Sequence, residues 1–142
     1  MENRHLCKAR PIGTRKQWVT GFYAVLGEKT VIIVNEPEKF YDVDSGKNSH
    51  GNKIVEVIPE TVCQCTGLKD KNGNLIWEND IMEAHLDDKF PEDATRTRVV
   101  WDKNAWVTNE PGTVDREYLD EFDTEHFYVI GNVFDNPELL VE

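Results

Sequence analysis

The sequence predicts a mainly β protein with one short helix, built as a small SH3-like barrel together with an N-terminal β-hairpin sheet. Two observations lead to this class. Short runs rich in β-branched and aromatic residues, such as QWVTGFYAVL and TVIIV, alternate with turn residues along the chain. Helical periodicity is scarce, and only VDREYLDEF, residues 114–122, has the spacing of a short helix. We expect a single domain, with the hairpin part in about residues 1–60 and the barrel part in about residues 61–142.

The N-terminal part is predicted to begin with a hairpin of residues 17–26 and 30–34, because Gly27-Glu28-Lys29 suits a short turn. Residues 53–59, KIVEVIP, place apolar groups on both faces and read as an inner strand. The apolar TVIIV segment has few charges that would protect a strand edge. An unprotected edge favours pairing between copies, so a homo-oligomer is expected.

The C-terminal part is predicted to contain a second hairpin and a last strand. Residues 96–107 turn at Asp102-Lys103-Asn104, and residues 76–107 would supply part of the barrel. Residues 126–134, HFYVIGNVF, form the last strand, in which Gly131 marks a bulge or a close backbone approach.

Composition limits the class of protein. The chain has 142 residues, 39% of them hydrophobic, which suits one domain with one core. Its apolar runs, such as Val31 to Val34, are short and its N-terminus is charged, so no membrane span or signal peptide is expected. Three cysteines without a secretory signal indicate reduced thiols and a cytoplasmic protein.

Charge is distributed unevenly along the chain. Residues 1–60 hold nine Lys or Arg and eight Asp or Glu, whereas residues 61–142 hold seven and nineteen. The acidic half repels nucleic acid, so binding of DNA by the whole domain is disfavoured. An acidic surface also keeps a small protein soluble, and this simpler interpretation is the more favoured of the two.

The stretch CQCTGLKDKNGNLIWENDI, residues 63–81, raises the question of a metal site. Asp70, Asn72 and Asn74 have the spacing that opens an EF-hand calcium loop. The sixth position is Leu75 instead of Gly, and the twelfth is Ile81 instead of Glu. Asn-Gly between two β-like runs is instead a strong hairpin signal, so a tight turn is favoured over a calcium loop.

The cysteines and carboxylates of the same stretch have similar alternatives. Cys63 and Cys65 would share one strand face, where two buried thiols are favoured over a zinc site because no second ligand pair follows. Glu78 and Asp80 would share a strand face and could act as an acid/base pair of a hydrolase, but no motif supports this. We expect no metal, no cofactor and no catalytic residue.

Two segments resemble the signature of the YopX family, small proteins encoded by phages and prophages. These are VIPETVCQCTGLKDKNGNLIWENDI and FYVIGNVFDNPELL, with weaker similarity in WVTGFYAV. The resemblance implies a phage context but no reaction, since members have no assigned activity. Members usually have Gly where this chain has Asn79, so the turn there would be shaped differently. Cys63 and Cys65 also depart from the family pattern.

Read physically, the signature residues are predicted to be structural. Glycines allow tight turns, Asp and Asn side chains bond nearby backbone, and Pro ends the last strand. The residues concerned are Gly67, Asp70, Gly73, Asp80, Gly131, Asn132, Asn136 and Pro137. The alternative is a ligand loop built from Asp70, Asn72, Asp135 and Asn136.

Residues 110–125 are the best candidate for a partner-binding surface. They hold seven carboxylates against Arg116 alone, with an apolar edge of Tyr118, Leu119 and Phe122 on the predicted helix. An acidic rim around aromatic anchors suits docking onto a basic surface. The competing interpretation is a solvated helix whose apolar edge packs inward. The candidate binding residues are Tyr118, Asp120, Glu121, Phe122 and Asp123.

These observations predict a non-catalytic accessory protein that acts through contacts with a host or phage protein in the bacterial cell. The alternative is a nucleic-acid-associated module, in which Arg10, Arg15 and Lys16 of the basic N-terminal arm contact phosphate while the acidic half faces away. Nucleic acid is the less favoured partner, and no membrane contact is expected.

Overall fold

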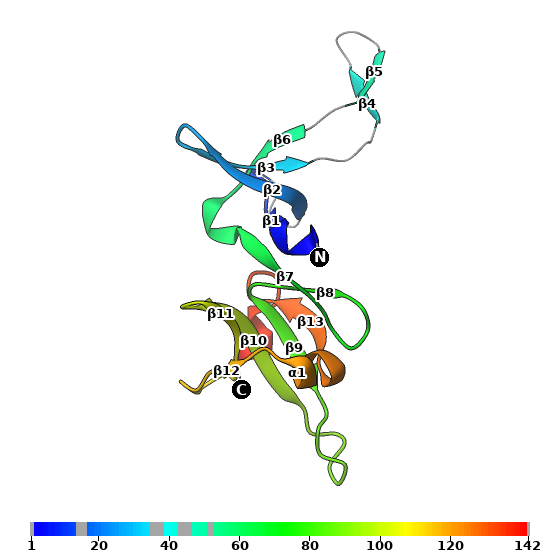
Figure 1. Ribbon diagram of the computed structural model, residues 1–142, viewed down its shortest axis with the longest axis vertical. Coiled ribbons are helices and arrows are strands. Elements are labelled where there is room, and N and C mark those ends of the chain that lie inside the picture. The colour runs from blue at the N-terminus through cyan, green and yellow to red at the C-terminus, as the bar shows by residue number, and fades with distance from the viewer. Residues whose placement is uncertain (1, 14–16, 35–38, 43–46, 51–52, 142) are drawn as a thin grey trace. The chain divides into compact units, whose positions relative to one another are not determined.

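The computed structural model describes residues 2–13, 17–34, 39–42, 47–50 and 53–141. The chain divides into two compact units, one of residues 5–62 and one of residues 63–142 together with 1–4. Both are built mainly from antiparallel strands, and the described residues contain one α-helix, so the predicted mainly β class is confirmed (Figure 1). No helix within the described ranges is long and apolar enough to cross a membrane.

The first unit contains an antiparallel sheet in the order β6-β3-β2-β1. The predicted first hairpin is confirmed, with Gly27-Glu28 as its turn and Gly27 at φ 66°. A separate pair of strands, β4 and β5, belongs to the same unit. The strands are β1 (Cys7–Ala9), β2 (Val19–Leu26), β3 (Lys29–Val34), β4 (Lys39–Asp42), β5 (Lys47–His50) and β6 (Lys53–Glu56); the short 3-10 helices are η1 (Glu2–His5) and η2 (Pro59–Thr61).

Two expectations about this sheet are wrong. The TVIIV segment is not an edge, because β3 pairs with β2 on one side and with β6 on the other. The expected inner strand is instead the edge strand β6, which ends at Glu56. Its apolar residues on both faces misled the prediction: Val55 packs against the core, whereas Ile54 on the other face is 58% exposed. The prediction of a homo-oligomer therefore no longer has the exposed strand edge from which it was argued.

The second unit contains the hairpin of β7 (Cys63–Lys69) and β8 (Leu75–Trp77) and a five-stranded antiparallel sheet. The predicted turn at Lys103-Asn104 is confirmed, as is the bulge before Gly131. The sheet has the order β12-β11-β10-β9-β13. Its strands are β9 (Asp80–Ala84), β10 (Thr95–Asp102), β11 (Ala105–Asn109), β12 (Glu117–Tyr118) and β13 (Tyr128–Asn132), and the 3-10 helix η3 (Pro137–Leu140) follows.

This sheet is open, so the expected SH3-like barrel is not formed. Across residues 63–141, which the structure describes without a gap, β12 and β13 stand at opposite edges of the five-stranded sheet. A barrel closes only when its edge strands pair with each other. β12 has only two residues and uses them to pair with β11, at Thr108 and Val107.

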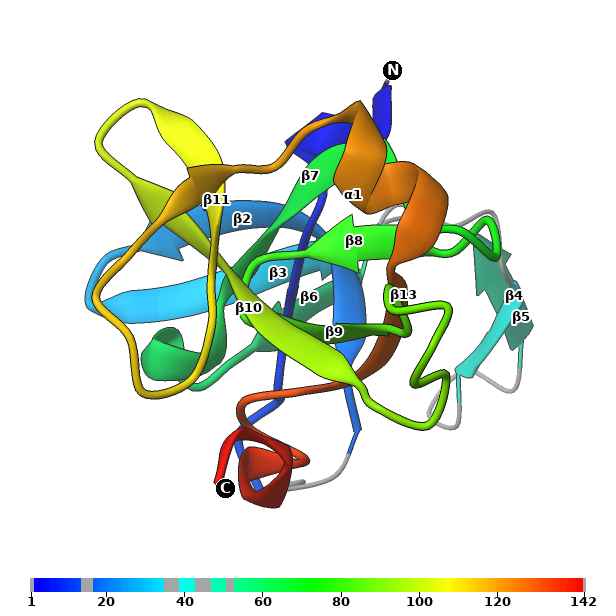
Figure 2. The same ribbon diagram turned by 90° about the horizontal axis from the view of Figure 1, so that it is seen from below.

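The helix α1 (Glu121–His126) lies further along the chain than the predicted residues 114–122. Glu117 and Tyr118 are extended instead, because they form β12 against β11. Figure 2 shows the chain running from β11 toward α1, and Figure 1 labels β12 on this path. The prediction therefore started the helix too early, because residues 117–118 form a strand and Asp120 caps the helix that begins at Glu121.

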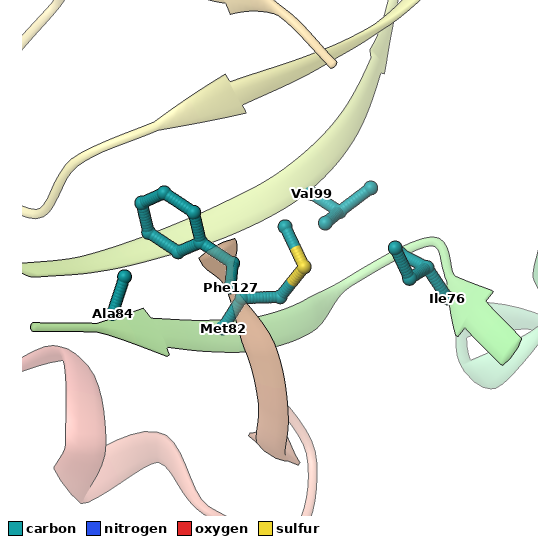
Figure 3. Packing of buried hydrophobic residues seen from close by; sticks show 5 residues of the cluster. All are labelled: Ile76, Met82, Ala84, Val99 and Phe127. Atoms are coloured by element: carbon teal, nitrogen blue, oxygen red, sulfur yellow. The ribbon is translucent and has the colours of Figure 1, made fainter. Parts of the chain in front are cut away.

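The core of the second unit gathers on one face of the five-stranded sheet. Ile76, Met82, Ala84, Val99 and Phe127 are almost fully buried and form one cluster (Figure 3). Trp106, Leu119 and Val129 pack against it. This core is built from β8, β9 and β10 and from the residue that links α1 to β13.

Candidate functional site

Helix α1 begins at a reciprocal cap made by two carboxylates. Asp120 Oδ1 accepts a hydrogen bond from Asp123 N at 3.2 Å, and Asp123 Oδ2 accepts one from Asp120 N at 3.1 Å. This capping box satisfies two backbone N–H groups that the first turn leaves without a partner. The helix ends where Phe127 N donates to Asp123 O at 2.9 Å. The cap thereby fixes the start of α1 and the positions of both carboxylates.

Beside α1 lies a cavity of about 300 Å³, at the lower end of the range for small-molecule pockets. Threonines, apolar side chains and carboxylates line it. We call this cavity the acidic pocket. Its lining residues are Leu86, Thr95, Thr97, Thr108, Glu110, Thr113, Asp115, Glu117, Asp120, Phe122, Asp123 and Phe127.

The pairing of strands brings three of the threonines onto the core face of the sheet. Thr97 lies opposite Met82, and Thr95 lies opposite Ala84. Thr108 of β11 lies opposite the core residue Val99. Side chains directly opposite each other in antiparallel strands point to the same side. The three threonine side chains therefore lie on the same face of the sheet as the apolar core, and they also line the pocket.

Thr97 has an unsatisfied hydroxyl in this pocket. The residue is only 3% exposed, and its Oγ1 makes no hydrogen bond. A buried hydroxyl without a partner costs roughly 1–3 kcal/mol. Thr108 differs, since its Oγ1 donates to Glu117 O at 3.5 Å. The Thr97 oxygen is itself buried, so this unsatisfied hydroxyl lies in the protein interior.

The pocket carries strong negative charge. Five of the lining side chains that the structure describes are carboxylates, and none of these described residues is lysine or arginine. Burial raises the pKa of Asp123 above its ordinary value, and the neighbouring negative charges of Asp120 and Glu117 raise it further. The hydrogen bond from the Asp120 backbone opposes this rise without cancelling it. A cation in the pocket would relieve the repulsion between these groups.

The titratable side chains among the described lining residues are all carboxylates, with no histidine, cysteine or lysine among them. Among the described residues, no three His, Cys, Asp or Glu side chains gather closely enough to hold a metal ion.

The sequence-predicted binding residues separate into two groups. Asp120, Phe122 and Asp123 line the acidic pocket, and Phe122 is 50% exposed. Tyr118 is 74% exposed and lines a different depression with Arg116, whose Nη1 lies 3.2 Å from Asp102 Oδ2. Glu121 is exposed and lines neither of these two depressions.

The predicted apolar edge does not pack as one unit. Leu119 packs against the core, whereas Tyr118 and Phe122 remain exposed. Sequence reasoning missed Thr95, Thr97, Thr108 and Phe127 as pocket residues. The alternating threonines of TRTRVV were a detectable signal, because residues two apart share a strand face.

Glu78 and Asp80 do not share a strand face, so that expectation is wrong. Glu78 lies in the turn between β8 and β9, where its Oε1 accepts a hydrogen bond from Gln64 N at 3.1 Å. Asp80 is almost fully buried, and its Oδ2 accepts from Trp77 N at 2.8 Å. Both carboxylates hold backbone in place.

Comparison with known proteins places the chain in a family. The sequence model of the YopX protein family matches residues 25–141. The chain belongs to the YopX family. Its fold resembles the crystal structure of protein EF1440 from Enterococcus faecalis, with a TM-score of 0.58 and 19% sequence identity over 96% of each chain. No curated protein sequence matches the chain.

The YopX signature around Asp70 forms a hairpin turn. Asp70 Oδ1 accepts hydrogen bonds from Asn72 N and Asn74 N, both at 2.9 Å. Its Oδ2 accepts from Val129 N of β13 at 2.8 Å, although 59 positions separate the two residues. Gly73 has φ 84° within the turn. The carboxylate therefore ties the β7–β8 turn to the five-stranded sheet.

Gly67 and the two cysteines shape strand β7. Gly67 has φ 83°, and a Cβ there would lie 3.0 Å from Arg4 Cβ. Cys63 and Cys65 are both buried and alternate with the exposed Gln64, as the spacing predicts. Cys65 Sγ accepts a hydrogen bond from Gly67 N at 3.4 Å.

The second YopX segment forms a compact turn after β13. Asn132 Oδ1 accepts from Phe134 N and Asp135 N, both at 2.9 Å. Asn136 Oδ1 accepts from Asn132 N at 3.3 Å. Pro137 then begins η3. The Asx side chains of this segment bond its own backbone.

Of the basic residues of the alternative hypothesis, the structure describes Arg10, which belongs to the first unit. Arg10 lies over the ring of Trp18, with 5.3 Å between Cζ and the ring centroid, and Lys8 lies over the same ring at 4.9 Å. Arg15 and Lys16 fall outside the described residues. Arg10 is thus engaged in a cation–π contact within its own unit.

Proposed function

We propose that this YopX protein is a non-catalytic accessory protein of a phage or prophage that binds a basic surface of a host or phage protein in the bacterial cell. The acidic pocket is the observation that supports this function: five carboxylates line a partly apolar cavity, and the described part of the lining holds no lysine or arginine. Such a field attracts a basic partner over a distance, and the exposed ring of Phe122 offers it an apolar contact.

A charge-reversal experiment tests this proposal. Glu110 and Asp115 line the pocket and are exposed, and their side chains take no part in the helix cap, so Glu110→Lys/Asp115→Lys leaves α1 intact. We expect fluorescence anisotropy with a labelled octalysine peptide to show binding that weakens with salt and weakens at least about tenfold in this variant. Asp120 and Asp123 are unsuitable for the test because they form the cap.

The matched control is Glu28→Lys/Glu60→Lys, which changes net charge equally at two exposed positions of the first unit. Both variants should keep the circular dichroism spectrum of the parent protein. Equal weakening by the two variants would show a general charge effect and contradict a localised site. Salt-sensitive binding of duplex DNA by the parent protein, lost on Arg10→Glu, would favour the nucleic-acid alternative.

A further inference from the structure

The sheet of the first unit exposes apolar side chains on the face that points away from its core. Strand pairing places Phe22 of β2 opposite Ile33 of β3, and Ile33 opposite Ile54 of β6. Side chains directly opposite each other in antiparallel strands lie on the same face, so these three form one row across the sheet. Leu26 lies on this face too, because it follows Phe22 by four positions in the same strand. We call the face that carries these four residues the outer face.

The outer face is open to solvent at three of its four apolar residues. Phe22 is 43% exposed, Leu26 50% and Ile54 58%. The core of the unit lies on the opposite face of the sheet, around Ile32 and Val57, and makes no use of them. Single exposed apolar residues are common, but a row of them on adjacent strands marks an interaction surface.

The distribution of charge indicates a second copy of the chain as the partner. Residues 5–62, which make up the first unit, hold eight Lys or Arg and seven Asp or Glu, although the whole chain has a net charge of −11. The negative charge is therefore concentrated in the second unit. Two copies that met through their second units would repel each other, whereas their first units are nearly neutral.

The charged groups beside the apolar row are self-complementary. Lys29 lies opposite Leu26, and Glu56 lies opposite Val31 of β3, so both belong to the outer face. Lys29 Nζ is 3.7 Å from Glu56 Oε1, and both side chains are exposed. A two-fold contact brings the same face of each copy together. Each Lys29 then approaches Glu56 of the other copy, so the two copies attract each other twice.

We propose that the outer face of the first unit binds the outer face of a second copy and forms a two-fold symmetric homodimer. This surface is separate from the acidic pocket, so the inference goes beyond the proposed function. Sedimentation velocity of the full chain over about a hundredfold range of concentration tests it. We expect the mass to rise from that of one chain to that of two. A mass that stays at one chain, or grows past two, would overturn the proposal.

A matched pair of variants tests which face is used. Phe22→Thr/Ile54→Thr removes apolar area from the outer face and keeps residues that favour strands. The control Tyr23→Thr/Val25→Thr makes the same kind of change in β2 on the opposite face, at residues that are 51% and 56% exposed. We expect the dissociation constant of the dimer to rise at least about tenfold in the first variant and to stay unchanged in the control. Equal weakening in two variants that keep the parent circular dichroism spectrum would overturn the proposal.

Exchange of the two charges tests the two-fold geometry and leaves the apolar row unchanged. Lys29→Glu leaves only negative charge beside the row, and Glu56→Lys leaves only positive charge. Each variant alone should dimerise at least about tenfold more weakly, because like charges then meet. An equimolar mixture should recover the dimer, although both variants remain acidic overall. A mixture that associates no better than the separate variants would contradict the two-fold contact.

Discussion

Arg98 Nη2 donates a 2.8 Å hydrogen bond to Asn79 Oδ1, and this contact joins strand β10 to the turn between β8 and β9. Asn79 has φ 70°, in the left-handed region that favours glycine. Its backbone bonds in two directions, with Asn79 N donating to Val99 O at 2.8 Å and Asn79 O accepting from Val133 N at 3.0 Å. Asn79 thus adopts a backbone conformation that favours glycine and adds a side-chain contact with Arg98.

Substitution of Asn79 should separate these two roles. Asn79→Ala loses the contact with Arg98 and places a Cβ-bearing residue without a polar side chain in the left-handed region. We expect the free energy of unfolding to fall by about 2 kcal/mol. Asn79→Gly loses only the contact and should cost about 1 kcal/mol. Urea denaturation measures both, and a glycine variant less stable than the alanine variant would refute this division.

Asp70→Ala should be among the more damaging single changes in the second unit. It removes the acceptor of three backbone N–H groups, those of Asn72, Asn74 and Val129. The expected loss is about 3 kcal/mol in the free energy of unfolding. Asp87→Ala is the matched control, because Asp87 is exposed and accepts one local bond from Lys89 N. A loss at Asp70 as small as that at Asp87 would contradict the structural role.

The hairpin turn around Asp70 should not bind calcium. The oxygens of Asp70 already accept backbone hydrogen bonds, and the positions that complete an EF-hand loop hold Leu75 and Ile81. Calorimetry with calcium and with zinc should show no binding in the micromolar range. A micromolar site would instead revive the ligand-loop alternative.

Glu83 should make the stability of the second unit depend on acid. Burial raises the pKa of Glu83, but hydrogen bonds from Arg96 and Tyr128 outweigh it and bring the pKa below its ordinary value of 4.5. Arg96 Nε lies 3.0 Å from Glu83 Oε1, and Tyr128 Oη lies 2.9 Å from Glu83 Oε2. The native state therefore favours the charged carboxylate more than the unfolded state does.

Because the pKa of Glu83 is lower in the folded protein than in the unfolded chain, acid should reduce the stability. The contribution of Glu83 is complete above pH 4.5 and is lost as the pH falls through the lowered pKa of the folded state. Urea midpoints measured between neutral pH and pH 3 should fall over that window. Glu83→Gln should be less stable at neutral pH and should show a smaller fall. An identical pH profile in both proteins would exclude Glu83 as the source.

Gly131 should tolerate no side chain while Asn136 is present. A Cβ at Gly131 would overlap the Asn136 side chain, whose Oδ1 also accepts the hydrogen bond from Asn132 N. Gly131→Ala should cost about 1–3 kcal/mol by overpacking. The double variant Gly131→Ala/Asn136→Ala removes the two closest atoms, Asn136 Oδ1 and Cγ, and leaves only Asn136 Cβ, at 3.0 Å, so the two losses should not add. Additive losses in denaturation experiments would show that the two positions do not interact.

The sequence by itself determined the parts of the fold that depend on local conformation. Gly27-Glu28, Lys103-Asn104 and the Asn-Gly pair of residues 72–73 mark hairpin turns because their backbone preferences act within a few residues. The alternation of Cys63 and Cys65 with an exposed Gln64 follows from the period of a strand. The YopX membership was likewise readable from two short segments.

The tertiary structure decided what depends on pairing between distant segments. Residues 114–122 have helical spacing, yet Glu117 and Tyr118 pair with β11 and delay the helix until Asp120 caps it. β3 lies inside its sheet only because β6 returns to cover it. The acidic pocket forms because strand pairing brings Thr97 and Thr108 onto the face that holds Phe127. Local conformational preferences do not specify these pairings and contacts, because they depend on the register of strands far apart in the chain.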